Sequence, residues 1–321
     1  KMEQLESFLA KQKLPRLQDV TPEISESEIT LNNDSDVLGT GGYGTVFRGS
    51  HHGEAVAVKA MFGGDKDAKA NIPASVVKMM RREAMIMCSL NHPNILRVFG
   101  VVPERGWIVM ELCEGGSLDE LLRDPEVTID EPTQARIAAE TATGIAYLHM
   151  RDVSIVHGDM KAGNVLLTRD RAVRICDFGM SEAKDRSKTM TVAAAGAGGR
   201  GAAVTVAWSA PELFKDHPKS FATDVYALGL TLWEIYERRV PFGNMPEAAV
   251  VNQVLSGERP SFLSAEMPSA VKELVKACWS ADAKARPSAG KVAFILTELS
   301  KTTRRTTAAS RDDVDEASEA I

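Results

Sequence analysis

Residues 157–167 read HGDMKAGNVLL, and this short stretch decides how the rest of the sequence is interpreted. An acid, Asp159, is followed by the cation of Lys161 and the amide of Asn164, and then by a branched apolar run at 165–167. A carboxylate can accept a proton or orient a hydroxyl, and an ammonium can neutralise charge that builds up on a phosphate. An amide oxygen is a hard ligand that suits Mg²⁺. The stretch therefore combines a candidate base, a candidate charge neutraliser and a candidate metal ligand.

A second acid, Asp177, follows the strand-like run AVRIC at 172–176 and stands before Phe178 and Gly179. An acid at a strand end beside a glycine is a natural metal ligand. Mg²⁺ is commonly held by one or two protein oxygens together with phosphates. Asn164 and Asp177 are therefore the candidate metal ligands.

The stretch GTGGYGTV at 39–46 fits the pattern G-x-G-x-x-G-x-V. A dinucleotide-binding loop has the same glycines, but it opens a helix and has an acid about 20 residues further on. Here the glycines lead into another strand, VFRGS, with a turn at His52-Gly53 and a third strand behind it. We therefore expect a β-hairpin flap whose backbone N–H groups approach a phosphate.

Lys59 ends the alternating apolar run at 56–58. A lysine inside an apolar strand costs free energy unless it is paired, and its candidate partner is Glu83 on the helix predicted over 73–90. The alternative is a lysine at a strand end whose ammonium reaches water.

Composition excludes several classes of protein. The chain has 321 residues, 44% of them hydrophobic and 26% charged, with a net charge of −6. A sizeable core is expected, and a general nucleic-acid or anionic-membrane binder is disfavoured. The four cysteines are widely spaced without a CxxC, which favours free thiols in a reducing compartment. No apolar run approaches the ~18 residues of a membrane span.

The pattern along the chain changes from strands to helices. Strands are predicted in 35–61 and in the runs ILRVFGVV and WIVMELC, whereas later segments carry helical spacing. A short helix is predicted at 1–18 and a linker at 19–34. The later helices are predicted at 117–123, 132–151, 221–237, 246–256, 268–279 and 288–299.

These motifs occur in one order, together with A-P-E at 210–212, and the set resembles the eukaryotic protein kinase family. The resemblance covers residues 31–299. It implies an α+β, two-lobed fold with a small β-rich N-lobe that has one main helix and a larger helical C-lobe. The expected divisions are an N-terminal extension at 1–30, an N-lobe at 31–112, a C-lobe at 113–300 and a disordered tail at 301–321.

The resemblance implies roles for single residues. The implied catalytic residues are Asp159, Lys161, Lys59 and Glu83, and the implied ligands of Mg²⁺, or of Mn²⁺ in its place, are Asn164 and Asp177. The positions implied for ATP binding are Leu38, Gly39, Thr40, Gly41, Gly42, Tyr43, Gly44, Thr45, Val46, Ala57, Lys59, Met110, Glu111, Cys113 and Leu166. Structural roles are implied for a stack of Met87, Val98, His157 and Phe178 tied to Asp224, and for an ion pair between Arg286 and Glu212.

Two features favour serine/threonine specificity: Lys161 two residues after the acid, and Thr205 five residues before Ala210. Other features are similar to tyrosine kinases, namely Trp208 before A-P-E and the run CWSADAKARPS at 278–288. The mixture is typical of the tyrosine-kinase-like group, and we predict a serine/threonine kinase of that group.

The sequence departs from the family at Gly158, which replaces the arginine of H-R-D. That arginine binds a phosphate on the activation loop, and glycine has no donor with which to do so. We therefore expect an activity that depends less on such a phosphate. Ser187, Thr189 and Thr191 are candidate phosphorylation sites, with Arg186, Lys188 or Arg200 as alternative partners.

The predicted function is an ATP-dependent protein kinase of intracellular signalling, located in the cytoplasm. The alternatives are a dual-specificity or tyrosine kinase, a pseudokinase that binds nucleotide without turnover, and a small-molecule kinase. The complete catalytic set disfavours a pseudokinase. The expected partners are ATP, protein substrates and regulatory domains outside this chain, without nucleic acid.

Overall fold

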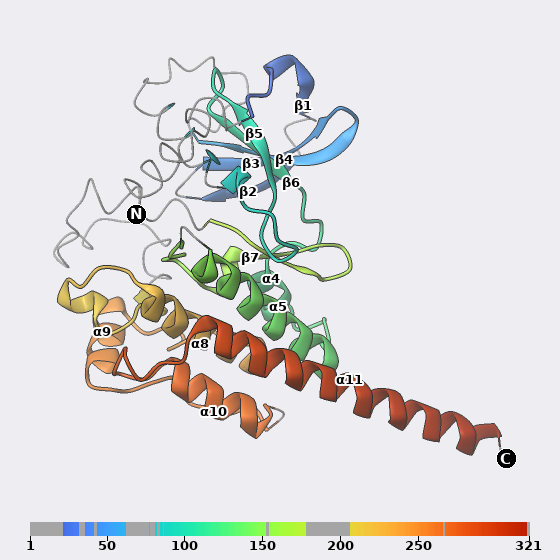
Figure 1. The fold of residues 1–321 in the computed structure, drawn as a ribbon, viewed down its shortest axis with the longest axis vertical. Coiled ribbons are helices and arrows are strands. Elements are labelled where there is room, and N and C mark those ends of the chain that lie inside the picture. The colour runs from blue at the N-terminus through green and yellow to red at the C-terminus, as the bar shows by residue number, and fades with distance from the viewer. Residues whose placement is uncertain are drawn as a thin grey trace.

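The computed structural model describes residues 22–31, 36–41, 44–61, 77, 81, 84–85, 87–151, 154–177, 206–265 and 267–319. The strands gather in one lobe and the helices pack together in the other, and the short hairpin of β7 and β8 lies between them (Figure 1). The predicted α+β, two-lobed architecture is confirmed.

The N-lobe is built on one antiparallel sheet whose strands follow the order β1-β3-β4-β6-β5, with β2 also paired to β3. Its strands are β1 (Ile29–Leu31), β2 (Val37–Gly41), β3 (Gly44–His51), β4 (Glu54–Ala60), β5 (Val98–Val102) and β6 (Trp107–Glu111). Alternate residues of β3 are buried, whereas β4 is buried from Val56 to Ala60 because it lies between β3 and β6.

The segment predicted as a linker at 19–34 contains part of this sheet. A 3₁₀ turn, η1 (Glu26–Glu28), leads into β1, and Ile29 pairs with His51 of β3. The side chains of Ile24 and Ile29 are buried in an apolar cluster with Phe47. The linker interpretation was wrong for these residues, because the two isoleucines bury apolar surface that the polar composition of the segment concealed.

The C-lobe helices begin at side-chain caps. Ser117, Asp130 and Ser220 each accept a hydrogen bond from a backbone N–H in the first turn of the helix that follows. The elements are α4 (Leu118–Arg123), α5 (Glu131–Met150), η2 (Ala162–Asn164), β7 (Val165–Leu167), β8 (Val173–Ile175), η4 (Leu213–Lys215), α8 (Phe221–Glu237), α9 (Glu247–Leu255), α10 (Ser269–Cys278) and α11 (Ala289–Glu319). Helix α8 is buried at every position from Thr223 to Glu237, so it is the centre of this lobe.

The predicted helices after residue 116 agree with the structure to within a residue or two at nearly every end. The exception is α11, which packs against α5 and continues to Glu319, through most of the segment predicted as a disordered tail (Figure 1). The sequence from Lys291 to Glu319 contains neither proline nor glycine, so nothing stops the helix. The side chains at 301, 302 and 304–306 are nevertheless exposed.

Several predictions fall outside the described residues: the helix at 1–18, Glu83 and most of its helix, and the segment 178–205. Within the described residues, no helix has the length and apolar character needed to cross a membrane. The four cysteines carry free thiols, as predicted.

Candidate active site

The loop before η2 brings Asp159, Lys161 and Asn164 together. The Asp159 Oδ2 atom accepts hydrogen bonds from Lys161 Nζ at 3.1 Å and from Asn164 Nδ2 at 3.0 Å. Asn164 Nδ2 also donates to the backbone oxygen of Asp159 at 2.6 Å. Because the amide nitrogen of Asn164 donates its hydrogen bonds to Asp159, the amide oxygen is the atom that can act as a metal ligand.

The second predicted metal ligand, Asp177, lies two residues beyond β8. Its Oδ1 atom accepts a hydrogen bond from Lys59 Nζ at 2.7 Å, and this lysine side chain is buried in β4. The structure therefore gives the buried lysine a carboxylate partner. Whether Lys59 also pairs with Glu83 lies outside the described residues.

Asp177 has a φ of +58°, a left-handed conformation that non-glycine residues rarely adopt. Such a conformation costs about 1–3 kcal/mol and tends to occur at functional sites. Just before it, Cys176 N donates to the backbone oxygen of Asn164 at 3.0 Å. The two candidate metal ligands therefore lie on segments joined directly by a backbone hydrogen bond.

The catalytic loop, residues 157–161, is hydrogen-bonded to Asp224 of α8. This buried carboxylate accepts hydrogen bonds from the backbone nitrogens of His157 and Gly158, both at 2.7 Å. It also lies 2.8 Å from His149 Nε2. The predicted tie between His157 and Asp224 is confirmed, and it extends to the glycine that replaces arginine.

The imidazole ring of His157 is hydrogen-bonded to the backbone of Asp159. Its Nε2 atom lies 3.1 Å from the oxygen of Cys176, and its Nδ1 atom accepts a hydrogen bond from Asp159 N at 3.2 Å. This pattern requires the tautomer that is protonated at Nε2. Burial lowers the pKa of His157, although Asp224, Asp159 and the Cys176 oxygen act in the opposite direction. The neutral ring is therefore the form that positions Asp159.

The glycine-rich stretch forms the predicted hairpin, with β2 paired to β3. Gly44 has a φ of +121°, and a Cβ atom there would lie 1.9 Å from the oxygen of Ala60. Only glycine fits this position. The hairpin leads into a strand and not into a helix, which excludes the dinucleotide-binding alternative for this loop. Gly42 and Tyr43 lie outside the described residues.

Three of the apolar residues implied for ATP binding lie on the neighbouring strands β3, β4 and β6. Val46 is opposite Lys59 across β3 and β4, and Ala57 is opposite Met110 across β4 and β6. The residues of this group that belong to the same apolar cluster are Val46, Ala57, Met110, Cys113 and Leu166. Leu38, by contrast, is exposed on β2, next to Gly39 and Thr40.

Glu111, the last residue of β6, is held by contacts with two arginine residues. Arg174 Nε lies 2.9 Å from one of its carboxylate oxygens and 3.1 Å from the other. Glu111 N donates to the oxygen of Arg97 at 2.9 Å. Burial raises the pKa of Cys113 to about 12, so its thiol is neutral beside the apolar cluster.

Comparison with known proteins agrees with this geometry. A family model described as protein tyrosine and serine/threonine kinase matches residues 33–296. The chain belongs to this kinase family. The dual description of the family also agrees with the mixture of serine/threonine and tyrosine features in the sequence.

The kinase domain is similar to several curated proteins. It is 34% identical to the probable serine/threonine-protein kinase SIS8 of Arabidopsis thaliana, over 87% of this chain and 26% of the relative. It is 33% identical to the dual specificity protein kinase shkA of Dictyostelium discoideum, over 87% and 50%. It is 34% identical to the serine/threonine-protein kinase CTR1 of Arabidopsis thaliana, over 84% of this chain and 32% of the relative. The chain thus spans between about a quarter and a half of the length of these relatives.

The predicted ion pair of the kinase C-lobe is confirmed. Arg286 donates to both carboxylate oxygens of Glu212, at 2.6 and 2.8 Å, and to the oxygens of Ala222 and Ser280. These contacts join the A-P-E segment to α8 and to the chain between α10 and α11. The pair is structural.

Sequence reasoning missed Glu234, a carboxylate with no solvent exposure in α8. It accepts hydrogen bonds from Trp208 Nε1 at 2.7 Å, Ala162 N at 3.2 Å and Arg123 Nη2 at 3.0 Å. It therefore links the segment before A-P-E to the catalytic loop. Its sequence signal was an acid inside the apolar run TLWEIY at 231–236, which no motif singled out.

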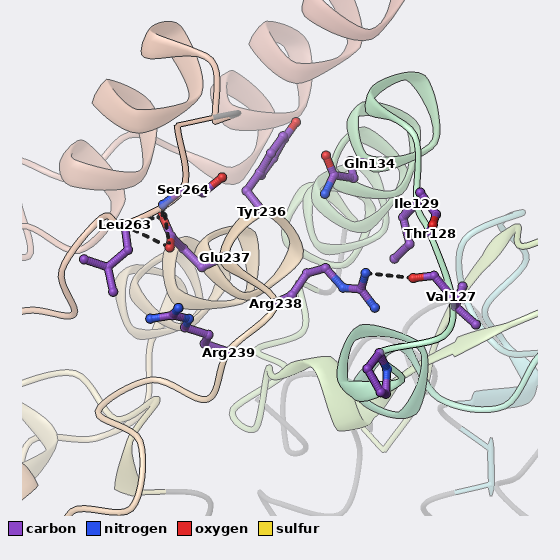
Figure 2. A pocket seen from close by; sticks show the side chains of 11 residues that line it. Val127, Thr128, Ile129, Gln134, Tyr236, Glu237, Arg238, Arg239, Leu263 and Ser264 are labelled. Atoms are coloured by element: carbon purple, nitrogen blue, oxygen red, sulfur yellow. Dashed lines mark hydrogen bonds between the residues drawn. The ribbon is translucent and has the colours of Figure 1, made fainter.

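A cavity of about 340 Å³ lies elsewhere in the kinase domain, and no predicted site residue lines it (Figure 2). Glu237 accepts hydrogen bonds from the backbone nitrogens of Leu263 and Ser264, and Arg238 donates to the oxygen of Val127. The charged groups of its walls therefore fix the loop before α10 and the connection from α4 to α5. This cavity is not the candidate active site.

Proposed function

We propose that this kinase domain transfers the γ-phosphoryl group of MgATP to serine and threonine hydroxyls of protein substrates. The observation that carries the proposal is the position of the Asp159 carboxylate, within hydrogen-bond distance of both Lys161 and Asn164. Family membership supports the reaction class, and the names of the relatives support the serine/threonine specificity.

The residues suit a magnesium-bound nucleotide. Asn164 offers an amide oxygen and Asp177 a carboxylate, and hard oxygen donors in this number fit Mg²⁺, with Mn²⁺ as an alternative. The metal would neutralise charge on the phosphates. Lys59 would contact the α- and β-phosphates, beneath the hairpin of β2 and β3.

The chain's own groups would then act on the substrate. Asp159 would orient the attacking hydroxyl and accept its proton, while the ammonium of Lys161 would offset charge on the transferred group. The backbone of Asp159 is hydrogen-bonded to His157, and its carboxylate is hydrogen-bonded to Asn164. Asp159 is therefore already oriented before the substrate binds.

The test of catalysis compares wild type with Asp159→Asn on a generic protein substrate with ATP and Mg²⁺. We expect kcat to fall by roughly a thousandfold, in the range that general-base groups contribute. Asp170→Asn is the matched control, because Asp170 lies in the exposed turn between β7 and β8. Equal turnover of Asp159→Asn and wild type would support the pseudokinase alternative.

Dual specificity is a second candidate, because two relatives carry that description in their names. Phosphoamino-acid analysis of the autophosphorylated domain separates the two. Phosphoserine and phosphothreonine are expected. Phosphotyrosine beside them would show dual specificity, and phosphotyrosine alone would contradict the serine/threonine assignment.

The cytoplasmic location and the regulatory domains outside this chain stay proposals. The free thiols support a reducing compartment. The relatives are two to four times longer than the matched region, which supports further domains. Localisation of a fluorescent fusion of the full-length protein checks the first proposal.

A further inference from the structure

Two histidines and a glutamate meet at one end of the N-lobe sheet. Glu28 offers a carboxylate oxygen, and His51 and His52 each offer a ring nitrogen. These three potential ligand atoms lie within 4.8 Å of one another. His52 Nε2 lies 3.2 Å from Glu28 Oε1, and the centroids of the two imidazole rings are 4.2 Å apart. The predicted kinase chemistry uses none of these residues.

Strand pairing and turn geometry bring the three together. Glu28 directly precedes β1, which pairs with the end of β3 at Ile29 and His51. Neighbouring residues on a strand point to opposite faces, so His51 and His52 would diverge if β3 continued. His52 instead has a φ of +50°, in the turn with Gly53. Asparagine, aspartate and histidine are the non-glycine residues most often found at such a position.

Glu28 is oriented by a second contact. Its Oε2 atom accepts a hydrogen bond from Ser25 N at 2.7 Å, as part of the cap of η1. This contact leaves Oε1 directed at His52. Metal-binding carboxylates are commonly held in this way by a neighbouring donor.

We propose that Glu28, His51 and His52 bind a Zn²⁺ ion. Two histidines and one glutamate form a known zinc ligand set, with a fourth position open to water. Bonds of 2.0–2.1 Å in a tetrahedron separate the ligand atoms by about 3.3 Å, close to the 3.2 Å between His52 and Glu28. The side chains of His52 and Glu28 are 68% and 38% exposed, so an ion can reach them.

The bound ion joins two parts of the N-lobe. It ties η1 and β1 to the hairpin between β3 and β4, next to the short pairing of β1 with β3. Zinc therefore stabilises the docking of residues 22–31 on the sheet, at a site separate from Asp159 and Lys59.

The test is calorimetric titration of the metal-free domain with zinc chloride. We expect one equivalent to bind, with a micromolar Kd that rises at least tenfold in His52→Ala and in Glu28→Gln. His217→Ala, at an exposed histidine of the C-lobe, serves as the control and should bind zinc as wild type does. The melting temperature of wild type should also rise with zinc and fall back with EDTA.

Cobalt substitution identifies the ligands directly. The absorption spectrum of the Co²⁺ form should lack a thiolate-to-metal charge-transfer band, because the proposed ligands are nitrogen and oxygen. Absence of binding, equal affinity in wild type and Glu28→Gln, or a thiolate band that assigns the ion to a cysteine would each overturn the proposal. Glu28→Gln keeps the shape of the side chain, so it decides the outcome even if His52→Ala unfolds.

Discussion

Asp224 Oδ1 accepts a hydrogen bond from the backbone N–H of Gly158 at 2.7 Å, which fixes the catalytic loop to the buried helix α8. Gly158 has a φ of +77° in this arrangement. Its neighbour His157 is held by the same carboxylate. The residue that replaces the family's arginine therefore stands at a position whose backbone conformation suits glycine.

Gly158→Ala should lower the free energy of unfolding by about 1–2 kcal/mol, because a Cβ atom is disfavoured in the left-handed region. Gly163→Ala is the matched control nearby, in η2: Gly163 has no positive φ, and among the described residues its added Cβ would meet only Lys161 Cε at 3.9 Å. Urea unfolding of the three proteins measures the difference. Equal losses in the two variants would contradict a conformational role for Gly158.

Activity should depend weakly on phosphorylation between Asp177 and Ala210, because Gly158 offers no side-chain donor to a phosphate. Replacing Thr189 and Thr191 together by alanine should therefore lower kcat by well under a thousandfold. Steady-state kinetics of untreated wild type provides the reference. A loss of a thousandfold or more would show that another basic residue has taken the place of the missing arginine.

The stability of the domain should fall as pH decreases below 6.5 through the buried ring of His157. Burial holds the pKa of His157 below its ordinary value of 6.5. In this pH range the unfolded chain therefore binds more protons than the folded protein, and protonation favours unfolding. Above pH 6.5 the full contribution is present.

Unfolding free energies measured between pH 8 and pH 4 check this expectation. The difference between wild type and His157→Gln should decrease as the pH falls. The corresponding difference for His217→Gln, at an exposed histidine, is measured for comparison. A wild-type advantage over His157→Gln that is independent of pH would rule out titration of this ring.

Removing residues 301–321 should cost less than about 1 kcal/mol of stability, because the side chains at 301, 302 and 304–306 are exposed and bury little apolar surface. Leu296→Ala, at a buried position of the same helix, should cost about 2–5 kcal/mol. Thermal unfolding measures both. A loss of stability well above 1 kcal/mol on truncation would show that the end of α11 packs against another part of the protein.

The sequence predicted those parts of the fold that depend on local pattern. Helices such as 221–237 were placed correctly, since their apolar spacing and the cap at Ser220 are both visible in the chain. Strand β1 was missed because it has only three residues, and its pairing with β3 is a long-range contact without a local signal. The end of α11 was missed because its polar composition is equally typical of a tail.

The part of the candidate site that belongs to sequence motifs was predicted from the sequence. Asp159, Lys161 and Asn164 lie together as their spacing suggested. Lys59 contacts Asp177 across the two lobes, and its predicted pairing with Glu83 lies outside the described residues. Glu234 could not be found, because its importance arises from three donors that are far apart in sequence and converge only in the folded protein.

The contact between Lys59 and Asp177 has a consequence for the order in which ligands bind. An ammonium and a carboxylate 2.7 Å apart cancel each other's charge, so a cation that approaches Asp177 alone must displace Lys59. Phosphates that attract Lys59 would release the carboxylate for the metal. Nucleotide and metal should therefore bind cooperatively, and linkage requires each to raise the affinity of the other by the same factor.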